Sequence, residues 1–538
     1  MTRNNWRTLF ATGIIGVGVV HAQGGGDLCD RIRGLTNDPA VAMAHWGVSV
    51  TTLDGTVLCG INEGQLFRPA SNDKLFTMAA ALALLGPDRR FRTSVMTEGE
   101  LKDGVLKGNL KLVGGGDPDF GSTDVPYVEP AQRPKTPVPE PATIADIEEL
   151  ADKVVASGLR RVEGNIVGDD SYFAWEPYPV GWGIDDLTPG YGAPVTGLTI
   201  DDNELEVNIS PNDVKAGEPA LVEVLPDVGY YNMANDAVTS PREKEPRAKL
   251  EIERGVGSLV VTISGSIPLN AGERHEHLAI QDPAAYAATA LLVALERRGV
   301  KVTGTSLAYH AMVEPENADS TSVAEKESAI RHSAYERVCS GSQVATGPAH
   351  AVLAMHQSPR LADDVVYTMK ESQNLHAEIL ARDLGAMWDP PCRATARPSA
   401  GRGVVRAYLV QAGIAASDFV LYDGSGLSGH DLVAPRAFTQ ILVYAAKQKW
   451  FDVYKAALPV GGVDGTLANR FQAPASKLTG KVLAKTGTLG ESRALSGYVE
   501  TAGGQTLVFS VMVDNHPPGT TADRVAMDKM VEAIAAGN

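Results

Sequence analysis

Apolar side chains recur at helical spacing in several parts of the chain. After residue 73 they are spaced three and four residues apart, which predicts a helix that stops at Gly86-Pro87. The same spacing predicts further helices in these ranges: 143–158, 282–300, about 360–385, 401–413, 435–448 and from about 521 onward.

Between these stretches, apolar and polar residues alternate as they do in strands. Two such runs flank Asp54-Gly55, a pair of residues that is typical of a hairpin turn. Three more runs, at 481–489, 494–503 and 506–515, follow one another before the last helix. The pattern therefore predicts a protein that mixes helices and strands. The triple glycine 114–116 is expected to be a turn, because no helix with a Lys-Ser/Thr start follows it.

Length and charge limit the classes of protein that fit. The chain has 538 residues, which suggests two to four domains at about 150 residues each. Hydrophobic residues make up 44% and charged residues 21%, as in soluble globular proteins. The formal net charge of −17 argues against nucleic acid and anionic membrane as main partners, because both bind clustered Lys and Arg.

The first 22 residues have the features of a secretory signal peptide. Two arginines precede an apolar run from Leu9 to Val20, and a small residue, Ala22, marks the expected cleavage site. The alternative, a membrane anchor, is disfavoured because the run is shorter than the ~20 residues that span a bilayer. No other stretch of the sequence approaches that length. We therefore expect an exported protein without an integral membrane segment after cleavage.

Four cysteines remain after the signal peptide, and an oxidising compartment permits disulfides between them. Four cysteines allow three pairings. Their grouping along the sequence favours Cys29–Cys59 and Cys339–Cys392. They form no CxxC motif, which argues against a zinc or redox motif.

A serine and a lysine stand where the helix after residue 73 begins, in the sequence PASNDKL. Ser71 and Lys74 are three residues apart, so their side chains share one face of a helical turn and can touch. The lysine could accept the serine proton if burial or a nearby cation lowered its pKa from about 10.4. The alternative is a surface helix cap, for which serine is well suited.

Two further motifs favour chemistry at Ser71. They are Ser372-Gln373-Asn374 and, at the end of a strand-like run, Lys485-Thr486-Gly487-Thr488. Ser-x-x-Lys, Ser-x-Asn and Lys-Thr-Gly together are the signature of serine enzymes that react with penicillin. Because Ser-x-Asn also occurs at 210–212, the order of all three motifs carries the prediction.

The motifs predict an acyl-transfer site with distinct roles. Ser71 attacks a carbonyl carbon and Lys74 accepts its proton. Ser372 relays that proton to the leaving amine, while Asn374 holds Lys74 and the substrate amide. Lys485 binds a terminal carboxylate and lowers the pKa of Lys74. The remaining expected substrate contacts come from Thr486, Gly487 and Thr488, and the backbone N–H groups of Ser71 and Thr488 would form an oxyanion hole.

The sequence resembles the low-molecular-mass class C penicillin-binding proteins, the D-alanyl-D-alanine carboxypeptidase/endopeptidase family. The likeness covers nearly all of the chain after the signal peptide. It rests on these segments: RPASNDKLFT, KGNLKLVGGGDP, GWGIDDLTPGYGAPVTGLTIDDN, HQSPRLADDVVYTMKESQNLHAEIL, YDGSGLSGHDLVAP, LPVGGVDGTLANR and GKVLAKTGTL. A difference is Gln373, where the family often has Asp or Asn.

The resemblance implies a mixed α/β (α+β) fold of the penicillin-binding-protein and serine β-lactamase type. An antiparallel sheet flanked by helices would include the N-terminal hairpin and the C-terminal strands. The family places two inserted domains between Ser71 and Ser372, which are 301 positions apart. The expected division is a catalytic domain at 23–91 and 308–538, a β-rich insertion at 92–118 and 197–307, and a smaller one at 119–196.

The implied function is a serine D-Ala-D-Ala carboxypeptidase, with endopeptidase action on peptidoglycan cross-links, that β-lactams inhibit covalently. Its partners would be peptidoglycan peptides in the periplasm, cell envelope or extracellular space, and it would need no cofactor. Asp186 is expected either to reach the site from the insertion and bind the ammonium group of a wall diamino acid, or to make local turn hydrogen bonds.

Other interpretations stay open at this point. A serine β-lactamase or esterase would share the fold, and Glu204 in ELEVN resembles the glutamate that activates water in class A β-lactamases. Its place before Ser372, in an alternating run, favours a strand instead. A non-catalytic wall-binding scaffold is disfavoured by the intact motifs. His275 and His277 could suggest a metal, but without a third ligand we expect a surface strand and no metal site.

Overall fold

The computed structural model describes residues 25–122, 124–133, 144–212, 215–241, 247–312, 350–388, 398–517 and 519–536. The expected signal peptide, Cys339 and Cys392 lie outside the described residues. Within the described ranges, no helix combines the length and the apolar character needed to cross a bilayer.

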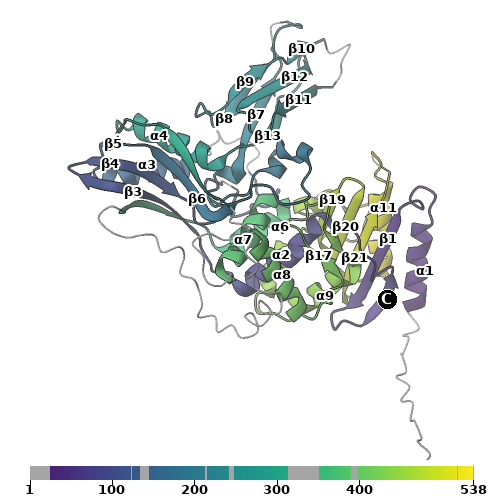
Figure 1. Cartoon of the computed structure of the whole chain (residues 1–538). Coiled ribbons are helices and arrows are strands. Elements are labelled where there is room, and N and C mark those ends of the chain that lie inside the picture. Colours follow the sequence, from purple (N-terminus) through teal and green to yellow (C-terminus); the bar gives the residue numbers. More distant parts are fainter. Residues whose placement is uncertain are drawn as a thin grey trace, which may run out of the picture.

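A five-stranded antiparallel sheet forms the centre of one lobe and joins the two ends of the chain (Figure 1). Its strands, in spatial order, are β19 (Val482–Leu489), β20 (Ser492–Glu500), β21 (Thr506–Asp514), β1 (His45–Thr52) and β2 (Val57–Ile61). The N-terminal hairpin therefore shares its sheet with the C-terminal strands, as the sequence predicts. In register, Val48 lies opposite Val511, so apolar residues of both ends meet in one core.

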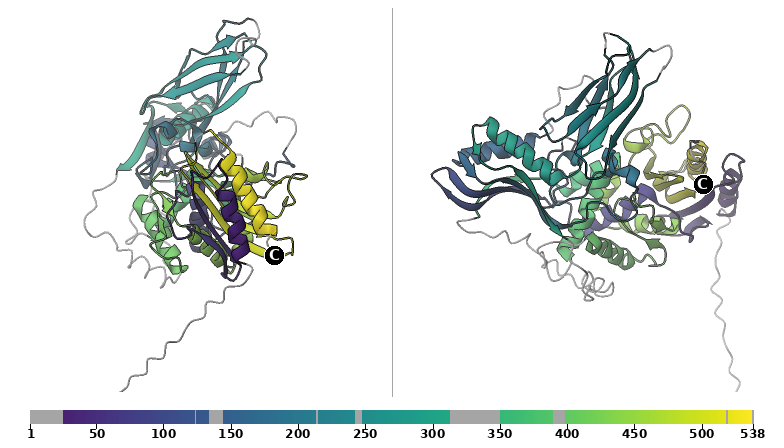
Figure 2. Two further views of the ribbon diagram at one scale, coloured as in Figure 1. Left: turned by 90° about the vertical axis from the view of Figure 1, so that its right-hand side faces the viewer. Right: turned by 45° about the horizontal axis from the view of Figure 1, so that its top comes forward.

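Helices cover both faces of this central sheet (Figure 2). On one face, α1 (Gly25–Thr36) and α11 (Ala522–Ala536) pack apolar residues against β19 to β21 and β1. On the other, α2 (Lys74–Leu84) and α9 (Pro435–Ala445) pack against β20 and β21. The helices beyond them are α6 (Leu361–Glu371), α7 (Asn374–Trp388), α8 (Pro398–Gln411) and α10 (Phe451–Ala457). A two-stranded ribbon, β17 (Phe419–Val420) with β18 (Leu432–Val433), directly precedes α9 in the sequence.

A disulfide joins α1 to the hairpin. Cys29 and Cys59 are bonded, with their Cα atoms 5.3 Å apart. This confirms the first of the two expected pairings. The second concerns Cys339 and Cys392 and stays a prediction.

Residues 92–357, which we call the insertion, leave the central lobe after α2 and return at α6 (Figure 1). Seven strands of the insertion form one mixed sheet, with α3 (Ala145–Ala156) and α4 (Pro283–Arg297) packed on it. They are β3 (Arg92–Lys102), β4 (Val105–Val113), β5 (Arg161–Glu163), β6 (Ile166–Trp175), β14 (Lys301–Val302), β15 (Ser306–Met312) and β16 (Val352–Gln357).

The remaining strands of the insertion form a small sandwich at the top of Figure 1. One sheet contains β7 (Glu204–Ser210), β8 (Leu221–Leu225) and β13 (Arg274–Ala279). The other contains β9 (Asn232–Asn235), β10 (Val238–Ser240), β11 (Lys249–Arg254) and β12 (Val260–Pro268). Apolar residues of the two sheets, such as Val207 and Ile263, share one core.

The strand pairing differs from the grouping that the sequence suggested. Residues 92–118 were expected to join 197–307. β14 and α4 of that range do lie with β3 and β4, but so do β5 and β6 of the range assigned to the other inserted domain, while β7 to β13 form the separate sandwich. β16, expected in the catalytic domain, also pairs with β3 of this sheet. Parallel pairing of β4 with β6 depends on contacts between distant segments, which alternation along the chain cannot encode.

The helix predicted at about 360–385 is interrupted. α6 ends at Glu371, and Ser372 takes the left-handed conformation, with φ of 67°, before α7 starts at Asn374. Non-glycine residues seldom adopt such a φ outside functional or tightly held sites. The break falls on the Ser372-Gln373-Asn374 motif and projects it from the junction of the two helices.

Candidate active site

Ser71 lies in η1 (Ala70–Asp73), a single 3-10 turn that leads directly into α2. It caps neither helix, because the N-cap residues are Pro69 for η1 and Asp73 for α2. Lys74, the first residue of α2, is fully buried. Its ammonium Nζ lies 2.9 Å from Ser71 Oγ. The interpretation of Ser71 as a simple surface cap is therefore wrong.

The Ser372-Gln373-Asn374 motif reaches Lys74 from α7. Lys74 Nζ donates to Asn374 Oδ1 at 2.6 Å and to the carbonyl oxygen of Ser425 at 2.8 Å. Asn374 Nδ2 in turn donates to the carbonyl oxygen of Tyr191, at 2.9 Å. Tyr191 belongs to η3 (Gly190–Gly192) of the insertion. The insertion thus contacts the group of residues around Ser71 directly.

Strand β19 brings the third motif to the same place. Lys485 is fully buried, and its Nζ donates to Ser372 Oγ at 2.7 Å and to the carbonyl oxygen of Thr486 at 2.9 Å. The hydroxyl of Thr486 lies 2.7 Å from that of Thr466 in η5 (Gly465–Leu467). Thr488 is exposed and lies opposite Arg493 on β20. Lys485 therefore links the third motif to Ser372 of the second, and Asn374 of the second contacts Lys74 of the first.

Gly487 has no side chain for a steric reason. A Cβ at this residue would lie 2.6 Å from the carbonyl oxygen of Pro69 and 3.1 Å from the backbone N of Ser71. Its absence lets β19 pass directly beside η1, which brings the edge strand against the backbone of Ser71.

Burial lowers the pKa values of both lysines. Burial lowers the pKa of Lys74 to about 8, although the carboxylates of Asp423, Glu378 and Asp73 oppose it. Burial, followed by the charge of Lys74, lowers the pKa of Lys485 well below its ordinary value. The sequence suggested that Lys485 acts on the pKa of Lys74; in the structure the lowering of that pKa comes from burial.

The residues behind Lys74 were not found from the sequence. Glu378 on α7 is buried and accepts hydrogen bonds from the backbone N–H groups of Gly424 and Ser425, both at 2.8 Å. Asp423 accepts from Ser425 N at 3.1 Å and Gly426 N at 2.7 Å. These bonds fix the turn whose Ser425 carbonyl contacts Lys74. The segment YDGSGLSGHDLVAP contains this turn, but the sequence does not indicate that the turn packs against Lys74.

Asp186 lies in η2 (Ile184–Leu187) and makes local contacts. Its Oδ2 accepts from Gly183 N at 2.9 Å, and its Oδ1 accepts from the Tyr191 hydroxyl at 3.0 Å. Burial, with the charge of Asp186, raises the pKa of Tyr191 to about 12. The local turn role is present. Through its hydroxyl, Tyr191 contacts Asp186, and its carbonyl oxygen accepts the hydrogen bond from Asn374 Nδ2.

A cleft of about 430 Å³ opens beside the motif on α7. Its lining includes Tyr191, Glu204, Glu371, Ser372 and Asn374. Glu204 belongs to β7, as predicted, and pairs with His277 of β13 at 3.1 Å. On the same strand, His275 contacts Glu206 at 2.8 Å. Both histidines are therefore on a strand and pair with carboxylates of its neighbour.

Comparison with known proteins gives matches along most of the chain. Residues 28–334 and 334–536 match the D-Ala-D-Ala carboxypeptidase 3 (S13) family. A D-alanyl-D-alanine carboxypeptidase of Actinomadura sp. (strain R39) is 32% identical over 514 residues, which cover 91% of this chain and 81% of that protein. D-alanyl-D-alanine carboxypeptidase DacB of Haemophilus influenzae is 25% identical over 483 residues, 88% of this chain and 86% of that protein.

Solved structures share the fold. The crystal structure of penicillin binding protein 4 from Haemophilus influenzae matches with a TM-score of 0.72 at 23% identity, and covers 93% of this chain and 98% of that one. A second structure of that protein, complexed with a β-lactam, matches with a TM-score of 0.68 at 22% identity, and covers 94% of this chain and 99% of that one.

Proposed function

Because this chain belongs to the D-Ala-D-Ala carboxypeptidase 3 (S13) family, we propose that it cleaves peptides after D-alanine through an acyl-enzyme on Ser71. The observation that carries the proposal is the contact of Lys74 with both Ser71 Oγ and Asn374 Oδ1, at 2.9 and 2.6 Å. A nucleophile, its base and a residue that orients the base are thus within hydrogen-bond reach of one another.

The proposed acylation starts with neutral Lys74. Its lone pair accepts the Ser71 hydroxyl proton, while its two N–H groups donate to Asn374 and the Ser425 carbonyl. The Ser71 oxygen then bonds to the carbonyl carbon of the penultimate D-alanine. As the C–N bond breaks, the proton passes through Lys74 and Ser372 to the departing D-alanine amine. Water next attacks the ester, with Lys74 as base, and Ser71 regains its proton.

Substrate binding is assigned to the edge strand and the turn before α2. The ammonium of Lys485 binds the terminal carboxylate of the peptide, and this partner restores the charge that burial disfavours. Thr486, Gly487 and Thr488 line the substrate. The N–H groups of Ser71 and Thr488 would stabilise the oxyanion, an assignment that the close approach of Gly487 to Ser71 N supports.

The natural substrates in this proposal are peptidoglycan stem peptides, and cleavage of cross-links follows from the same chemistry. Export by the N-terminal signal, with cleavage after Ala22, would bring the enzyme to the periplasm or cell envelope. β-Lactams acylate Ser71 in the same way. A related protein from Haemophilus influenzae has been crystallised with a β-lactam, which supports this part of the proposal.

One experiment separates a peptidase from a β-lactamase. The purified enzyme is mixed with penicillin or with a D-Ala-D-Ala peptide, and both reactions are followed by mass spectrometry. We expect repeated release of D-alanine and a penicilloyl adduct that persists for minutes or longer, because the tethered leaving group blocks the approach of water. An adduct that vanishes within seconds, with the peptide uncut, would establish a β-lactamase instead.

The pH dependence of acylation tests the role of Lys74. Lys74 accepts a proton only when it is neutral, so the acylation rate constant should rise with pH through about 8, the pKa of Lys74, and level off above it. At about pH 6 the rate constant should be roughly 100-fold below its plateau. Stopped-flow labelling with a fluorescent penicillin measures it, and a flat profile between about pH 6 and pH 9 would contradict the role.

Asp186 is proposed to bind the side-chain ammonium of a wall diamino acid. Asp186→Asn should lower kcat/KM for a peptide with that free amine by about 10-fold or more, since it weakens a charged hydrogen bond. Penicillin lacks this amine, so the rate constant for acylation by penicillin should change by less than about 2-fold. Asp185→Asn, at the exposed neighbouring carboxylate of η2, is the matched control. Parallel losses with peptide and penicillin would refute the specificity role.

A further inference from the structure

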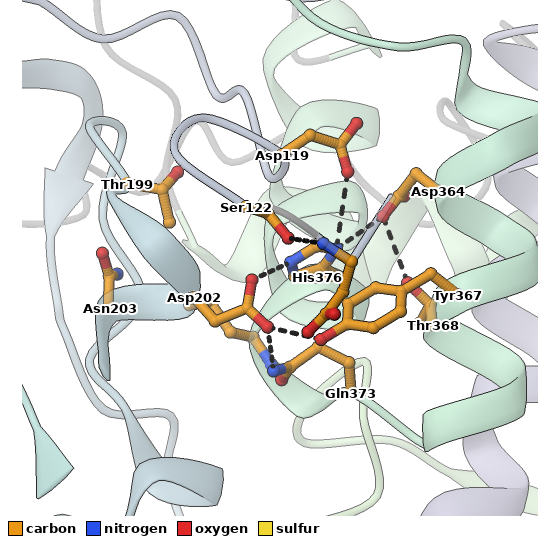
Figure 3. A network of polar contacts seen from close by, with 12 residues as sticks. Asp119, Ser122, Thr199, Asp202, Asn203, Asp364, Tyr367, Thr368, Gln373 and His376 are labelled. Atoms are coloured by element: carbon orange, nitrogen blue, oxygen red, sulfur yellow. Dashed lines mark hydrogen bonds and ion pairs between the residues drawn. The ribbon is translucent and has the colours of Figure 1, made fainter. Parts of the chain in front are cut away.

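A buried histidine lies between the insertion and the central lobe (Figure 3). His376 on α7 is fully buried. Its Nδ1 is 2.5 Å from Asp364 Oδ1 on α6, and its Nε2 is 2.9 Å from Asp202 Oδ1. Asp202 belongs to η4 (Asp201–Asn203) of the insertion. One imidazole therefore bridges carboxylates from the two parts of the chain.

The contacts define the charge of this histidine. Burial opposes the charged form, but Asp202 and Asp364 outweigh it and raise the pKa of His376 well above its ordinary value. An imidazolium donates through both ring nitrogens, which matches the two carboxylate contacts. The pKa of Asp202 is lowered in spite of its burial, because of His376 and the donors around it.

The second oxygen of Asp202 contacts the catalytic motif. Asp202 Oδ2 accepts from Gln373 Nε2 at 2.8 Å and from the Tyr367 hydroxyl at 2.7 Å. The other end of the Gln373 side chain, Oε1, accepts from Leu375 N at 2.9 Å, at the start of α7. Figure 3 shows Asp202 facing His376, Tyr367 and Gln373. Asp202 thus fixes the residue between Ser372 and Asn374.

The backbone that carries Asp202 is strained. Asp201, Asp202 and Asn203 have φ values of 46°, 52° and 55°, all in the left-handed region. Such a conformation is unfavourable for a non-glycine residue and persists only where the surroundings enforce it. The buried side chain of Asn203 holds the turn by accepting from Ile200 N at 2.9 Å and donating to Pro194 O at 2.8 Å. In this turn, the Asp202 side chain reaches Tyr367 on α6 and His376 on α7.

The position of Gln373 determines what this contact does. Ser372 and Asn374 flank it, and they contact Lys485 at 2.7 Å and Lys74 at 2.6 Å. Ser372 is itself in the left-handed conformation, with φ of 67°, which needs support from its neighbours. Movement of Gln373 would therefore displace the partners of both lysines.

We propose that Asp202 is a positioning residue for acylation: through Gln373 and His376, this carboxylate of the insertion holds Ser372 and Asn374 against Lys485 and Lys74. Asp202 touches neither substrate nor the reacting atoms and acts through these neighbours. The inference rests on the proposed function of Ser71. It gives the insertion a part in the chemical step, separate from any contact with substrate.

The test compares Asp202→Asn with a control built on the same architecture. In the insertion, His310 also bridges two carboxylates, Asp170 at 2.9 Å and Asp282 at 3.2 Å. Asp170→Asn weakens that bridge while leaving the catalytic motif untouched. For both variants, stopped-flow labelling with fluorescent penicillin separates the first-order acylation rate constant from the dissociation constant of the initial complex. Thermal unfolding is measured in parallel.

For Asp202→Asn we expect the acylation rate constant to fall by about 10- to 100-fold, the loss typical of misplaced catalytic groups, with little change in the initial complex. Asp170→Asn should stay within about 2-fold even where its unfolding temperature falls equally. If Asp202→Asn acylates within about 2-fold of the unmodified enzyme, its role is only structural and the proposal is overturned.

Gln373→Ala provides a second line of evidence and decides the question if Asp202→Asn does not fold. It breaks the bond to Asp202 but leaves the ion pairs of His376 with Asp202 and Asp364 in place. We expect about a 10-fold loss of the acylation rate constant, and in the double variant a loss no larger than that of the more severe single variant. An unchanged rate, or fully additive losses, overturns the proposal. Failure of the unmodified enzyme to react with penicillin and peptide would instead overturn the proposed function.

Discussion

Ser71→Ala is expected to abolish both peptide cleavage and covalent labelling by penicillin. Without the hydroxyl oxygen there is no acyl-enzyme, and loss of a catalytic nucleophile typically costs a factor of about 10⁴ or more. The fold should persist, because Ser71 is only partly buried and Lys74 keeps its contacts with Asn374 and the Ser425 carbonyl. Intact-mass spectrometry after exposure to penicillin measures the labelling.

Ser157→Ala is the matched control, since this serine lies at the end of α3 and its hydroxyl donates to the carbonyl of Val154, at 2.7 Å. That variant should label fully and cleave peptides at the rate of the unmodified enzyme. Labelling of Ser71→Ala at full stoichiometry would exclude Ser71 as the nucleophile. The adduct would then be located by peptide mapping.

Lys74→Met is expected to lower the acylation rate constant by about 10²- to 10⁴-fold, the usual contribution of a general base. Methionine fills a similar volume without a lone pair that can take the serine proton. The residual reaction should also lose its rise with pH through about 8, because the group that titrates there is gone. Stopped-flow labelling across the pH range measures the rate and the profile together.

Lys111→Met serves as the control for removing a partly buried lysine. Lys111 pairs with Glu98 at 3.0 Å and Asp169 at 3.1 Å in the insertion, away from the three motifs. Its loss should leave the pH profile of acylation unchanged. A Lys74→Met enzyme that kept the rise with pH would show that another group accepts the Ser71 proton, and the assignment of the base would fail.

The sequence by itself determined the parts of this protein that depend on local pattern. The apolar spacing after residue 73 gives α2, and Asp54-Gly55 gives the hairpin of β1 and β2, because turn chemistry and helical periodicity act over a few residues. The order of the three short motifs, which is tied to one kind of chemistry, predicted a site, and the fold brings Lys74 to Ser71 and Asn374, and Lys485 to Ser372. The residue types in the three motifs were enough to predict this candidate site, although the motifs are far apart in the chain.

Other features depend on which distant segments meet, and only the tertiary structure decided them. The sheet that joins β3 and β4 to β5 and β6 is set by register and burial between segments, so strands of both suggested inserted domains share it. Burial, which no short motif reports, lowers the pKa of Lys74. Asp202 illustrates the same limit: 171 residues separate it from Gln373, and packing of the insertion against α6 and α7 brings the two within 2.8 Å.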